Sequence, residues 1–516
     1  MKRGIVLYIL SLVFFAKADA QYKVVKVNTF SNSPNEVSIA IDPTNPAHMV
    51  AGANIQILYY STDSGKTWSE KELRSSMGVY GDPVLHADNK GNFYFGHLAK
   101  NKKLVIGAYD GLDRIIIQKS IDGGKTFSDG DYTGMDTTKT QDKHWFSHDK
   151  DNHIYVTWTE FDKYESKNPK DHSRIRFSRS KGEGVDYTPA ITISDTFGDC
   201  IDSDNTLEGA TTAIGPDGTV YAVWAGYEYI YFDQSKDGGN TWGKDHIIAH
   251  QKGGWDLPVK GLYRSNGMPF LHSDKNGKLY LLFADIRHGD MDVWLKISTD
   301  GGKTWTEDKR INHDELKNGA DQFTPNMCID PITQNVYIIY YDGHHSKSNM
   351  FTDVYMAFST DGGTTFNNLR LTPNSFPLPE KFIFFGDYID IDAVNNIVRP
   401  IWTDYNNNTT QVKCGLVNAN DIINYNTAPS RLDVAVKTSI SGKSIYVHTN
   451  SAYNQKYKVY LQYNKVGEPK KVGKMNLQKG ENEFHFKTSK LNYGSYDIIL
   501  KTKAGTITIP FTHPFL

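Results

Sequence analysis

The sequence predicts an all-β protein in which one four-stranded unit is repeated along most of the chain. An eight-residue motif, Ser-x-Asp-x-Gly-x-Thr-Trp/Phe, begins at Ser61, Ser120, Ser235, Ser298 and Ser359, at intervals of roughly 60 residues or twice that. The chain also has 43 Gly and 13% aromatic residues in short alternating runs, and no long segment has helical periodicity. Self-similarity at a fixed period predicts a stacked or circular array of sheets.

Each motif is predicted to form a hairpin turn. An Asp in the loop accepts hydrogen bonds from backbone N–H groups two residues on, the Gly adopts a positive φ, and the final aromatic ring folds back onto the turn. A degenerate copy that starts at Ser180 (SKGEGVDY) fills the gap in the series, with Gly182 in the place of the Asp. The Asp residues of the motifs are therefore predicted to be structural, and they are poor candidates for catalysis.

The motifs allow the repeated units to be counted. Each lies between the third and fourth strands of a unit, as in the series GMPFLHSD, GKLYLLFAD, DVWLKISTDGGKTW and DKRIN. The first strands of successive units begin near Val37, Asp82, Trp145, Gly209, Met268, Thr324 and Tyr388. The seventh unit lacks a motif and a fourth strand, and we expect the segment YKVVKVNTF to supply that strand, because closure removes open sheet edges. The prediction is a seven-bladed β-propeller over residues 21–425.

A second, smaller domain is predicted after the repeats end. Residues 431–516 contain strongly alternating runs (SIYVHTN, YKVYLQYN, NEFHFKTS) with turn residues between them, which is typical of a small β-sandwich. The segment LNYGSYDIILKTKAGTITI is similar to the C-terminal sorting domains of bacterial secreted proteins. An accessory glycan-binding module and a spacer are the two alternatives.

The N-terminal segment predicts export. Lys2 and Arg3 precede an apolar run at residues 5–16, and Ala18-Asp19-Ala20 forms a cleavage site, so residues 1–20 are predicted to be a signal peptide of a secreted or cell-surface protein. No second apolar segment is long enough to span a membrane. The net charge of −2 gives no basic field for nucleic acid or for an anionic membrane surface. We expect a monomer.

The three cysteines and the histidines do not predict a metal site. Cys200, Cys328 and Cys414 are far apart and have no metal-ligand spacing, so we expect buried thiols rather than disulfides. Residues His144, His288, His344 and His345 lack a helix-spaced metal signature. No cofactor is predicted, although a calcium ion among the carboxylates described next is compatible with the sequence.

Polar residues gather at two classes of loop that meet on one face of a propeller. The loops before the first strands carry Asp82, Asp142, His144, Trp145, Glu208, Tyr263, Arg264, Asn266 and Asp387, and those after the second strands carry Asp285, Arg287, Asp342, Asp404 and Tyr405. So many carboxylates repel one another unless cations such as Lys143, shared protons or a bound ion offset them.

These residues predict a glycan-cleaving pocket. Carboxylates of unequal pKa can divide the acid and base roles at a glycosidic bond, arginines can bind a sugar carboxylate, and aromatic rings can stack on a sugar. The predicted catalytic residues are Asp82, Glu208, His144, Tyr263 and Tyr405. The predicted substrate-binding residues are Arg264, Arg287, Asp142, Trp145, Asn266, Asp285, Asp342, Asp387 and Asp404. The alternative for each carboxylate is a structural role as a backbone cap or a bridge between blades.

The repeated motif resembles the Asp box, or BNR repeat, of the sialidase-like β-propeller superfamily. The resemblance implies an exo-α-sialidase or neuraminidase-type hydrolase, with an arginine triad for the substrate carboxylate, a Tyr–Glu nucleophile pair and an Asp acid/base. Arg264 and Arg287 would then belong to the clamp, with Arg174 or Arg114 as the third arginine. Glu208 with Tyr405 or Tyr263 would be the nucleophile pair, and Asp82 would be the acid.

Two departures from that family are visible. No arginine lies between the predicted signal peptide and the first box, where sialidases carry their first arginine. Sialidases are six-bladed, so a six-bladed ring is the alternative to seven. The chain also resembles secreted propeller lyases such as ulvan lyases, which act on uronic-acid polymers, and His144, Tyr263 and Arg264 could serve that chemistry. The third alternative is a non-catalytic propeller that binds glycan or protein.

Overall fold

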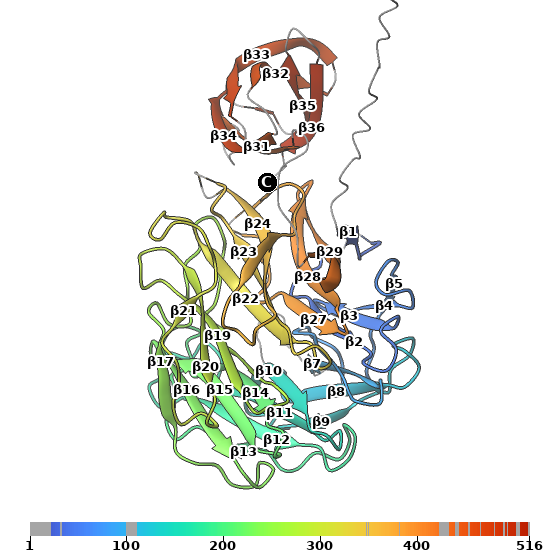
Figure 1. Ribbon diagram of the computed structural model, residues 1–516, viewed down its shortest axis with the longest axis vertical. Helices are drawn as coiled ribbons and strands as arrows, with labels where there is room; N and C mark the ends of the chain where they lie inside the picture. Colours follow the sequence, from blue (N-terminus) through green and yellow to red (C-terminus); the bar gives the residue numbers. More distant parts are fainter. Residues whose placement is uncertain are drawn as a thin grey trace, which may run out of the picture.

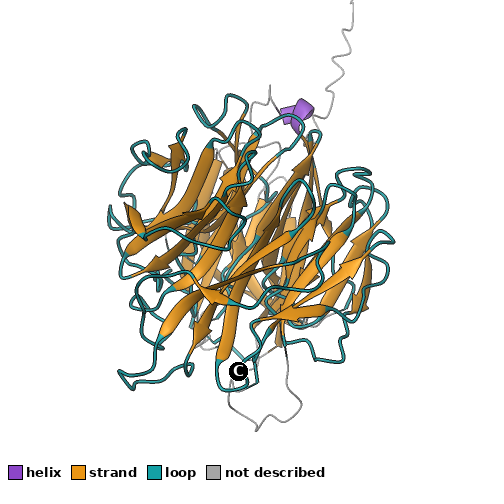
Figure 2. Cartoon of the chain, turned by 90° about the horizontal axis from the view of Figure 1, so that it is seen from below, coloured by secondary structure: helices purple, strands orange, loops and turns teal. Residues whose placement is uncertain are grey.

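The computed structural model describes residues 22–30, 33–99, 111–346, 348, 350–380, 382–422, 433–438, 443–451, 455–464, 466–478, 480–488, 491–492, 494–501 and 506–513. Within these ranges the chain is all-β, and its one helix is the short α1 (Ala419–Ile422) (Figure 2). No helix among the described residues is long and apolar enough to cross a membrane. The predicted signal peptide lies outside the described residues.

Seven antiparallel sheets follow one another along residues 23–418 (Figure 1). Sheet 1 is β2 (Ser38–Ile41), β3 (Met49–Ala53), β4 (Ile57–Ser61) and β5 (Ser69–Glu72). Sheet 2 is β6 (Val84–Ala87), β7 (Phe93–Leu98), β8 (Ile115–Ser120) and β9 (Asp131–Thr133). Sheet 3 is β10 (Thr140–His148), β11 (Ile154–Phe161), β12 (Ser173–Arg179) and β13 (Ile191–Thr192). Sheet 4 is β14 (Glu208–Ile214), β15 (Val220–Gly226), β16 (Tyr229–Ser235) and β17 (His246–His250).

The remaining three sheets have the same order of strands. Sheet 5 is β18 (Phe270–Ser273), β19 (Leu279–Asp285), β20 (Asp292–Ser298) and β21 (Lys309–Arg310). Sheet 6 is β22 (Gln322–Ile329), β23 (Val336–Asp342), β24 (Phe351–Ser359) and β25 (Asn367–Arg370), and β26 (Phe376–Pro377) also pairs with β24. Sheet 7 is β27 (Asp390–Val394), β28 (Ile397–Asn406), β29 (Thr409–Asn418) and β1 (Lys23–Lys26).

The first strands of the seven sheets contact one another in cyclic order. Strands β2, β6, β10, β14, β18, β22 and β27 each contact the next, and β27 returns to contact β2. The N-terminal strand β1 pairs with β29, with Val25 opposite Cys414, so sheet 7 joins the two ends of this part of the chain. This is the pairing that the sequence predicts for YKVVKVNTF.

Burial follows the position of a strand in its sheet. The second strands β15 (VYAVWAG), β19 (LYLLFAD) and β23 (VYIIYYD) are buried on both faces because each sheet lies between two neighbours. An outer strand such as β5 (SEKE) is largely exposed. Apolar side chains are therefore buried between neighbouring sheets. Each Å² of apolar surface that is removed from water stabilises the fold by roughly 25 cal/mol. Cys200, Cys328 and Cys414 are buried free thiols.

The Ser, Asp, Gly and Thr hydrogen bonds of the turn recur at each complete copy of the motif, whereas the Trp Nε1 bond forms only at Trp68 and Trp305 among the described residues. In the first copy, the Asp63 carboxylate accepts from the Ser61 hydroxyl at 2.9 Å and from the N–H and hydroxyl of Thr67 at 2.9 and 2.7 Å. The Ser61 hydroxyl oxygen accepts from Gly65 N–H at 2.9 Å, and Trp68 Nε1 donates to the Gly65 carbonyl at 2.9 Å. The motif Asp residues are thus engaged in the turns, and none lines the cavity described below.

The fifth residue of each motif also joins neighbouring sheets. Gly239, at the end of sheet 4, has φ +88°, and a Cβ there would lie 2.2 Å from Phe177 Cε1 of sheet 3. Gly302 and Gly124 meet Phe232 and Val50 of their preceding sheets in the same way. The turn can approach the preceding sheet this closely because glycine has no Cβ and accepts a positive φ.

Two further sheets follow in the C-terminal part of the chain (Figure 1). One is β30 (Asp433–Thr438), β31 (Ser444–Ser451) and β34 (Gly480–Lys487). The other is β33 (Val466–Leu477), β32 (Gln455–Tyr463), β35 (Gly494–Lys501) and β36 (Thr506–His513). Both sheets contribute to one buried apolar cluster, which includes Val447, Val459, Phe486 and Leu500.

Candidate functional site

A cavity of about 1500 Å³ lies on the face of the repeated sheets where their first strands begin and their second strands end. We call it the main cavity. Six carboxyl side chains line it, against two cations. The carboxyl groups are those of Glu36, Asp82, Asp142, Glu165, Asp202 and Asp256, and the cations are Lys143 and Arg264. Of the residues predicted from the sequence, only members of the loops before the first strands are among the described lining residues.

Lys143 is the buried cation at the base of the main cavity. Its Nζ lies 2.6 Å from Asp387, 3.2 Å from Asp82 and 3.8 Å from Glu36. The chain reaches this position through a β-bulge, because the register of β10 on β11 shifts between Asp142 and Trp145 and Lys143 has φ +47°. The bulge lets adjacent residues of one strand project into the same site.

Arg264 is fully engaged by protein carboxylates. Its guanidinium binds Asp387 through two nitrogens, one of them Nε at 2.8 Å from Oδ1, and Nη1 donates to Asp202 at 2.8 Å. The guanidinium also lies 5.4 Å from the centre of the Phe384 ring. Because both sides of the fork are occupied, Arg264 is not free to bind a sugar carboxylate as the resemblance implies.

The carboxyl groups of the site differ in proton affinity. Burial raises the pKa of Asp142 to about 7, and the negative charges of Asp82 and Asp202 add to this effect against Lys143. Burial also raises the pKa of Asp387, but Arg264 and Lys143 outweigh it and hold that pKa well below its usual range. One carboxyl group therefore holds a proton near neutral pH while another stays ionised.

The rim of the main cavity is open and carries an aromatic ring. Tyr263 is 66% exposed, and Glu165 and Asp256 are also exposed. Tyr164 OH donates to Asp202 at 2.8 Å, which fixes the wall opposite Arg264. An exposed ring above a polar floor can stack on the apolar face of a sugar.

Seven of the fourteen predicted site residues fall into three sets. Asp82, Asp142, Tyr263 and Arg264 line the main cavity. Asp387 and Asn266 lie behind its wall, where Asn266 Nδ2 donates to the Asp387 carbonyl at 3.1 Å. Trp145 packs edge-on against Phe270 and Tyr388, so it fills space between sheets and is not among the described lining residues.

Glu208 and His144 are buried and are not among the lining residues, which corrects the roles predicted for them. Glu208 is 0% exposed, and within the described structure neither carboxyl oxygen has a hydrogen-bond partner. Burial, with the negative charges of Asp202 and Asp142 nearby, raises the pKa of Glu208 well above its usual range. His144 stacks on Phe146, and burial lowers its pKa to about 4, so it is neutral. A substrate in the main cavity does not meet either group.

Tyr405, Asp404, Arg287 and Asp285 also lie elsewhere. Tyr405 is buried in the apolar cluster around sheet 7, and burial raises the pKa of Asp404 to about 6. Arg287 binds Asp285 and Asp308 and lies 4.3 Å from the centre of the Trp294 ring. These four residues are not among those that line the main cavity, and Arg287 is too engaged to act as a free clamp.

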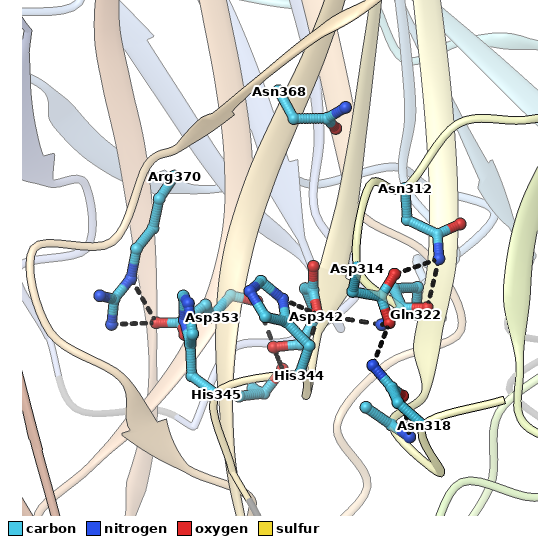
Figure 3. Close-up of polar contacts among 12 residues, drawn as sticks. Asn312, Asp314, Asn318, Gln322, Asp342, His344, His345, Asp353, Asn368 and Arg370 are labelled. Atoms are coloured by element: carbon cyan, nitrogen blue, oxygen red, sulfur yellow. Dashed lines mark hydrogen bonds and ion pairs between the residues drawn. The ribbon is translucent and has the colours of Figure 1, made fainter. Parts of the chain in front are cut away.

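Asp342 belongs to a second polar cluster, on sheet 6 (Figure 3). It accepts from Gln322 Nε2 at 3.0 Å and from His344 N–H at 2.8 Å. Beside it, Arg370 donates to Asp353 at 3.0 and 2.8 Å, and His345 Nδ1 lies 3.0 Å from the same carboxylate (Figure 3).

This second cluster reaches the C-terminal sheets. Arg370 forms an ion pair with Glu481 of β34, and the other oxygen of Glu481 bonds to His448 of β31. Ser346 donates to Glu483 at 2.9 Å. Asp342 therefore contributes to a junction between two parts of the chain. Among the described residues, no group of three or more His, Cys, Asp or Glu is arranged to hold a metal ion.

Several residues of the main cavity are absent from the sequence-based set. Glu36 precedes β2 as Asp82 precedes β6, so its position in the repeat could have identified it. Asp202, Tyr164 and Asp256 lie in long loops outside the repeat, where no periodic signal exists. Glu36 accepts from Asn54, and burial with the nearby charge of Asp82 raises its pKa.

Comparison with known families supports the turn motif. The family model described as BNR/Asp-box repeat matches residues 59–70 and 296–307. The chain carries BNR/Asp-box repeats. The other motif copies form the same hydrogen-bonded turn in the structure, for example at Ser235 and Asp237. No curated protein matches the chain.

Solved structures with a similar arrangement include carbohydrate-active proteins. A Hadza microbial sialidase is 15% identical with a TM-score of 0.39, covering 72% of this chain and 73% of its own. A Trypanosoma rangeli sialidase is 10% identical with a TM-score of 0.39, covering 95% and 89%. A PL25 ulvan lyase is 9% identical with a TM-score of 0.40, covering 77% and 92%. Similarity at this level says nothing about the activity of this chain.

Proposed function

We propose that the chain is an exported seven-bladed β-propeller with a C-terminal β-sandwich. The seven sheets, the cyclic contacts of their first strands and the β1–β29 pairing support seven blades over six. The apolar cluster shared by the two C-terminal sheets supports the sandwich. The segment at residues 1–20 supports export, and N-terminal sequencing of the mature protein tests it, with Gln21 as the expected first residue.

The main cavity of this propeller acts as the active site of a glycoside hydrolase. The observation that carries this proposal is that two carboxyl groups in different surroundings line one cavity: Asp142, whose pKa is raised to about 7, and Asp82, which lies 3.2 Å from Lys143 Nζ. Asp142 donates a proton to the leaving oxygen, and Asp82 acts on the sugar as base or nucleophile. Tyr263 provides the platform for the sugar ring.

The charge of the main cavity favours a neutral sugar over the acidic sugar that the resemblance implies. Six carboxyl side chains face two cations, and both cations are engaged by carboxylates. A sialic acid or uronate would enter without a free arginine to meet its charge. Of the two residues expected to act as a base in a lyase, His144 is buried outside the lining and Tyr263 lies at the exposed rim, and Arg264 is engaged by carboxylates, so hydrolysis fits the site better than elimination.

Product analysis tests the proposal. Purified residues 21–516 are incubated with neutral, sialylated and uronic-acid glycans, and the products are analysed by mass spectrometry. We expect cleavage of a neutral glycan with uptake of one water, and a fall of about 100-fold or more in kcat for Asp142→Asn and for Asp82→Asn. Activity should decline as the pH rises above about 7, because Asp142 then loses its proton.

The matched control is Asp151→Asn, which removes one exposed carboxylate far from the lining residues. It should keep the activity of the parent. Full activity in Asp142→Asn would contradict the assignment of the acid. Unsaturated products would indicate a lyase, and an untouched panel with bound sugar would indicate a binding propeller.

A further inference from the structure

A second cavity, of about 640 Å³, lies between sheets 2 and 3. We call it the rim groove. It is formed by β9 and the loop that follows it, by β12, and by the degenerate turn motif. Its lining is Tyr132, Thr133, Gly134, Met135, Asp136, Lys139, Glu160, Arg174, Arg176, Lys181, Tyr187, Thr188, Pro189 and Ala190. None of the described residues lines both the rim groove and the main cavity.

The charges of the rim groove alternate along a row. Lys139 pairs with Asp162, which also accepts from Arg174 Nη2 at 2.7 Å. Arg174 Nη1 lies 3.2 Å from Glu160, and the other Glu160 oxygen lies 3.6 Å from Arg176 Nε. The row therefore contains three cations and two carboxylates, and it ends on Arg176.

Arg176 is the cation of this row whose hydrogen bonds all go to neutral acceptors, because its ion pair with Glu160 is longer, at 3.6 Å. Its Nη1 donates to the Thr192 hydroxyl at 2.6 Å and its Nη2 to the Ala190 carbonyl at 3.1 Å, and both of these acceptors are neutral. Among the described residues, its Nε has no hydrogen-bond partner. A guanidinium has five donors, so Arg176 keeps donors for a ligand.

The remaining charges of the groove are already engaged. Asp136 accepts from the N–H and hydroxyl of Thr138 at 2.9 and 2.7 Å. Lys181 forms an exposed pair with Asp186. The hydrogen bonds from Thr138 lower the pKa of Asp136, and the nearby charges of Lys139 and Arg176 lower it further. Arg176 therefore faces the carboxylates of Asp136 and Glu160 without a direct hydrogen bond to either.

An aromatic ring lies in the same groove as this charge. Tyr132 is 40% exposed, and the Arg114 guanidinium lies 5.1 Å from its ring centre. The neighbouring Met135 and Pro189 are exposed as well. An aromatic ring in the same groove as an arginine suits a ligand that has an apolar face and one acidic group.

We propose that the rim groove is a non-catalytic binding site for an acidic sugar of a polysaccharide. The sugar carboxylate or sulfate binds at Arg176, and the sugar ring packs against Tyr132. The groove thus has the opposite charge preference to the main cavity. When an acidic sugar unit occupies the rim groove, the polymer stays bound to the protein and that unit does not enter the main cavity at Asp142.

Binding is measured in the Asp142→Asn protein, so that turnover is not needed for the result. The probes are short galacturonic-acid oligosaccharides, their methyl-esterified neutral counterparts, and sulfated oligosaccharides, each titrated by calorimetry. We expect binding of an acidic form and not of the ester, with a loss of about tenfold or more in affinity for Arg176→Gln and for Tyr132→Ala. Binding of only the carboxylated or only the sulfated probe identifies the acidic group.

The control is Arg74→Gln, which removes a highly exposed arginine outside both cavities and should bind like the parent. Thermal unfolding of each variant separates lost binding from lost folding, and Tyr132→Ala keeps every charge of the row. Equal binding of the acidic and esterified forms would overturn the charge assignment. Failure of every acidic probe to bind would overturn the site, and it would leave the hydrolase proposal untouched.

Discussion

The residues around the main cavity hold several carboxyl groups close together because two cations are buried with them. Lys143 contacts Asp387, Asp82 and Glu36, and Arg264 contacts Asp387 and Asp202. The two cations share Asp387, whose ionised form they stabilise. The network can be tested by removing either of its positive charges.

Lys143→Met should lower the free energy of unfolding by about 3–5 kcal/mol, because it leaves buried carboxylates without their cation. Urea denaturation at neutral pH measures this loss. The loss should shrink at acidic pH, where the carboxyl groups take up protons.

The exposed Lys236 offers the control, since Lys236→Met removes the same charge and lies in a turn. A change below about 0.5 kcal/mol is expected there. If Lys143→Met were as stable as the parent at neutral pH, Lys143 would not be the stabilising cation of the site.

Asp142 should make stability depend on pH. Its pKa is raised to about 7 in the folded protein from an ordinary value of 3.8. The stability that it contributes is therefore complete below about pH 4 and is lost as the pH rises through about 7. Asp142→Asn cannot ionise, so its melting temperature relative to the parent should rise between about pH 4 and about pH 7 and stay level above that. Parallel melting curves that keep a constant difference would contradict the raised pKa.

Part of this site could be predicted from single residues, and part could not. Asp82, Asp142, Tyr263 and Arg264 reach the main cavity as their loop positions indicate. Glu208 and His144 do not, because the register of β10 shifts after Asp142 and that of β14 shifts after Glu208. A bulge changes which side chains share a face, and the sequence carries no clear signal for it.

At the scale of elements, the turn motif joins sheets as well as strands. The Asp of the motif stabilises the turn, and the glycine at its fifth position lets the turn contact the preceding sheet. The degenerate motif keeps this second function, since a Cβ at Gly184 would lie 2.3 Å from Tyr94 Cε1 of sheet 2. The spacing of the motifs follows the spacing of the four-stranded sheets because turn and contact depend on the same short segment.

Gly239→Ala should destabilise the protein by about 1–3 kcal/mol, because its Cβ would overlap Phe177 and its φ is +88°. Thermal unfolding measures the change. The control is Gly218→Ala, which has a similar φ of +84° and no atom within 4 Å of the added Cβ.

The difference between the two variants isolates the contact between sheets from the backbone strain. Equal destabilisation would mean that Phe177 moves aside at no cost and that the motif does not hold sheets 3 and 4 together.

At the scale of the whole molecule, β1 completes sheet 7 and brings distant segments together. Deletion of residues 21–28 should lower the urea midpoint and expose the edge of β29, which promotes association through that edge. Size-exclusion chromatography and urea unfolding measure the two effects. The control replaces the exposed Lys23 and Lys26 by Gln, which keeps the strand and should change neither the urea midpoint nor the association state. An unchanged midpoint after the deletion would show that β1 is dispensable.

The C-terminal sheets should depend on Glu481 for their attachment to sheet 6. Glu481→Gln removes the charge that pairs with Arg370, so limited proteolysis should separate the two parts faster than in the parent. Glu468→Gln, at an exposed position of the same C-terminal sheets, should not change the rate. Equal rates in both variants would show that the Arg370–Glu481 ion pair does not hold the junction. This junction was not predictable, because its partners lie 111 residues apart, in segments with different patterns.

The pairing of β1 with β29 also sets an order on biosynthesis. At about 5–20 residues per second, the ribosome needs on the order of 20–80 s between the synthesis of Lys23–Lys26 and that of Thr409–Asn418. During that interval the first strand lacks β29 as its partner, so a nascent chain cannot close its ring before β29 has been synthesised. A chain released early by stalling keeps this strand unpaired, which gives quality-control proteases a way to tell an incomplete copy from a finished one.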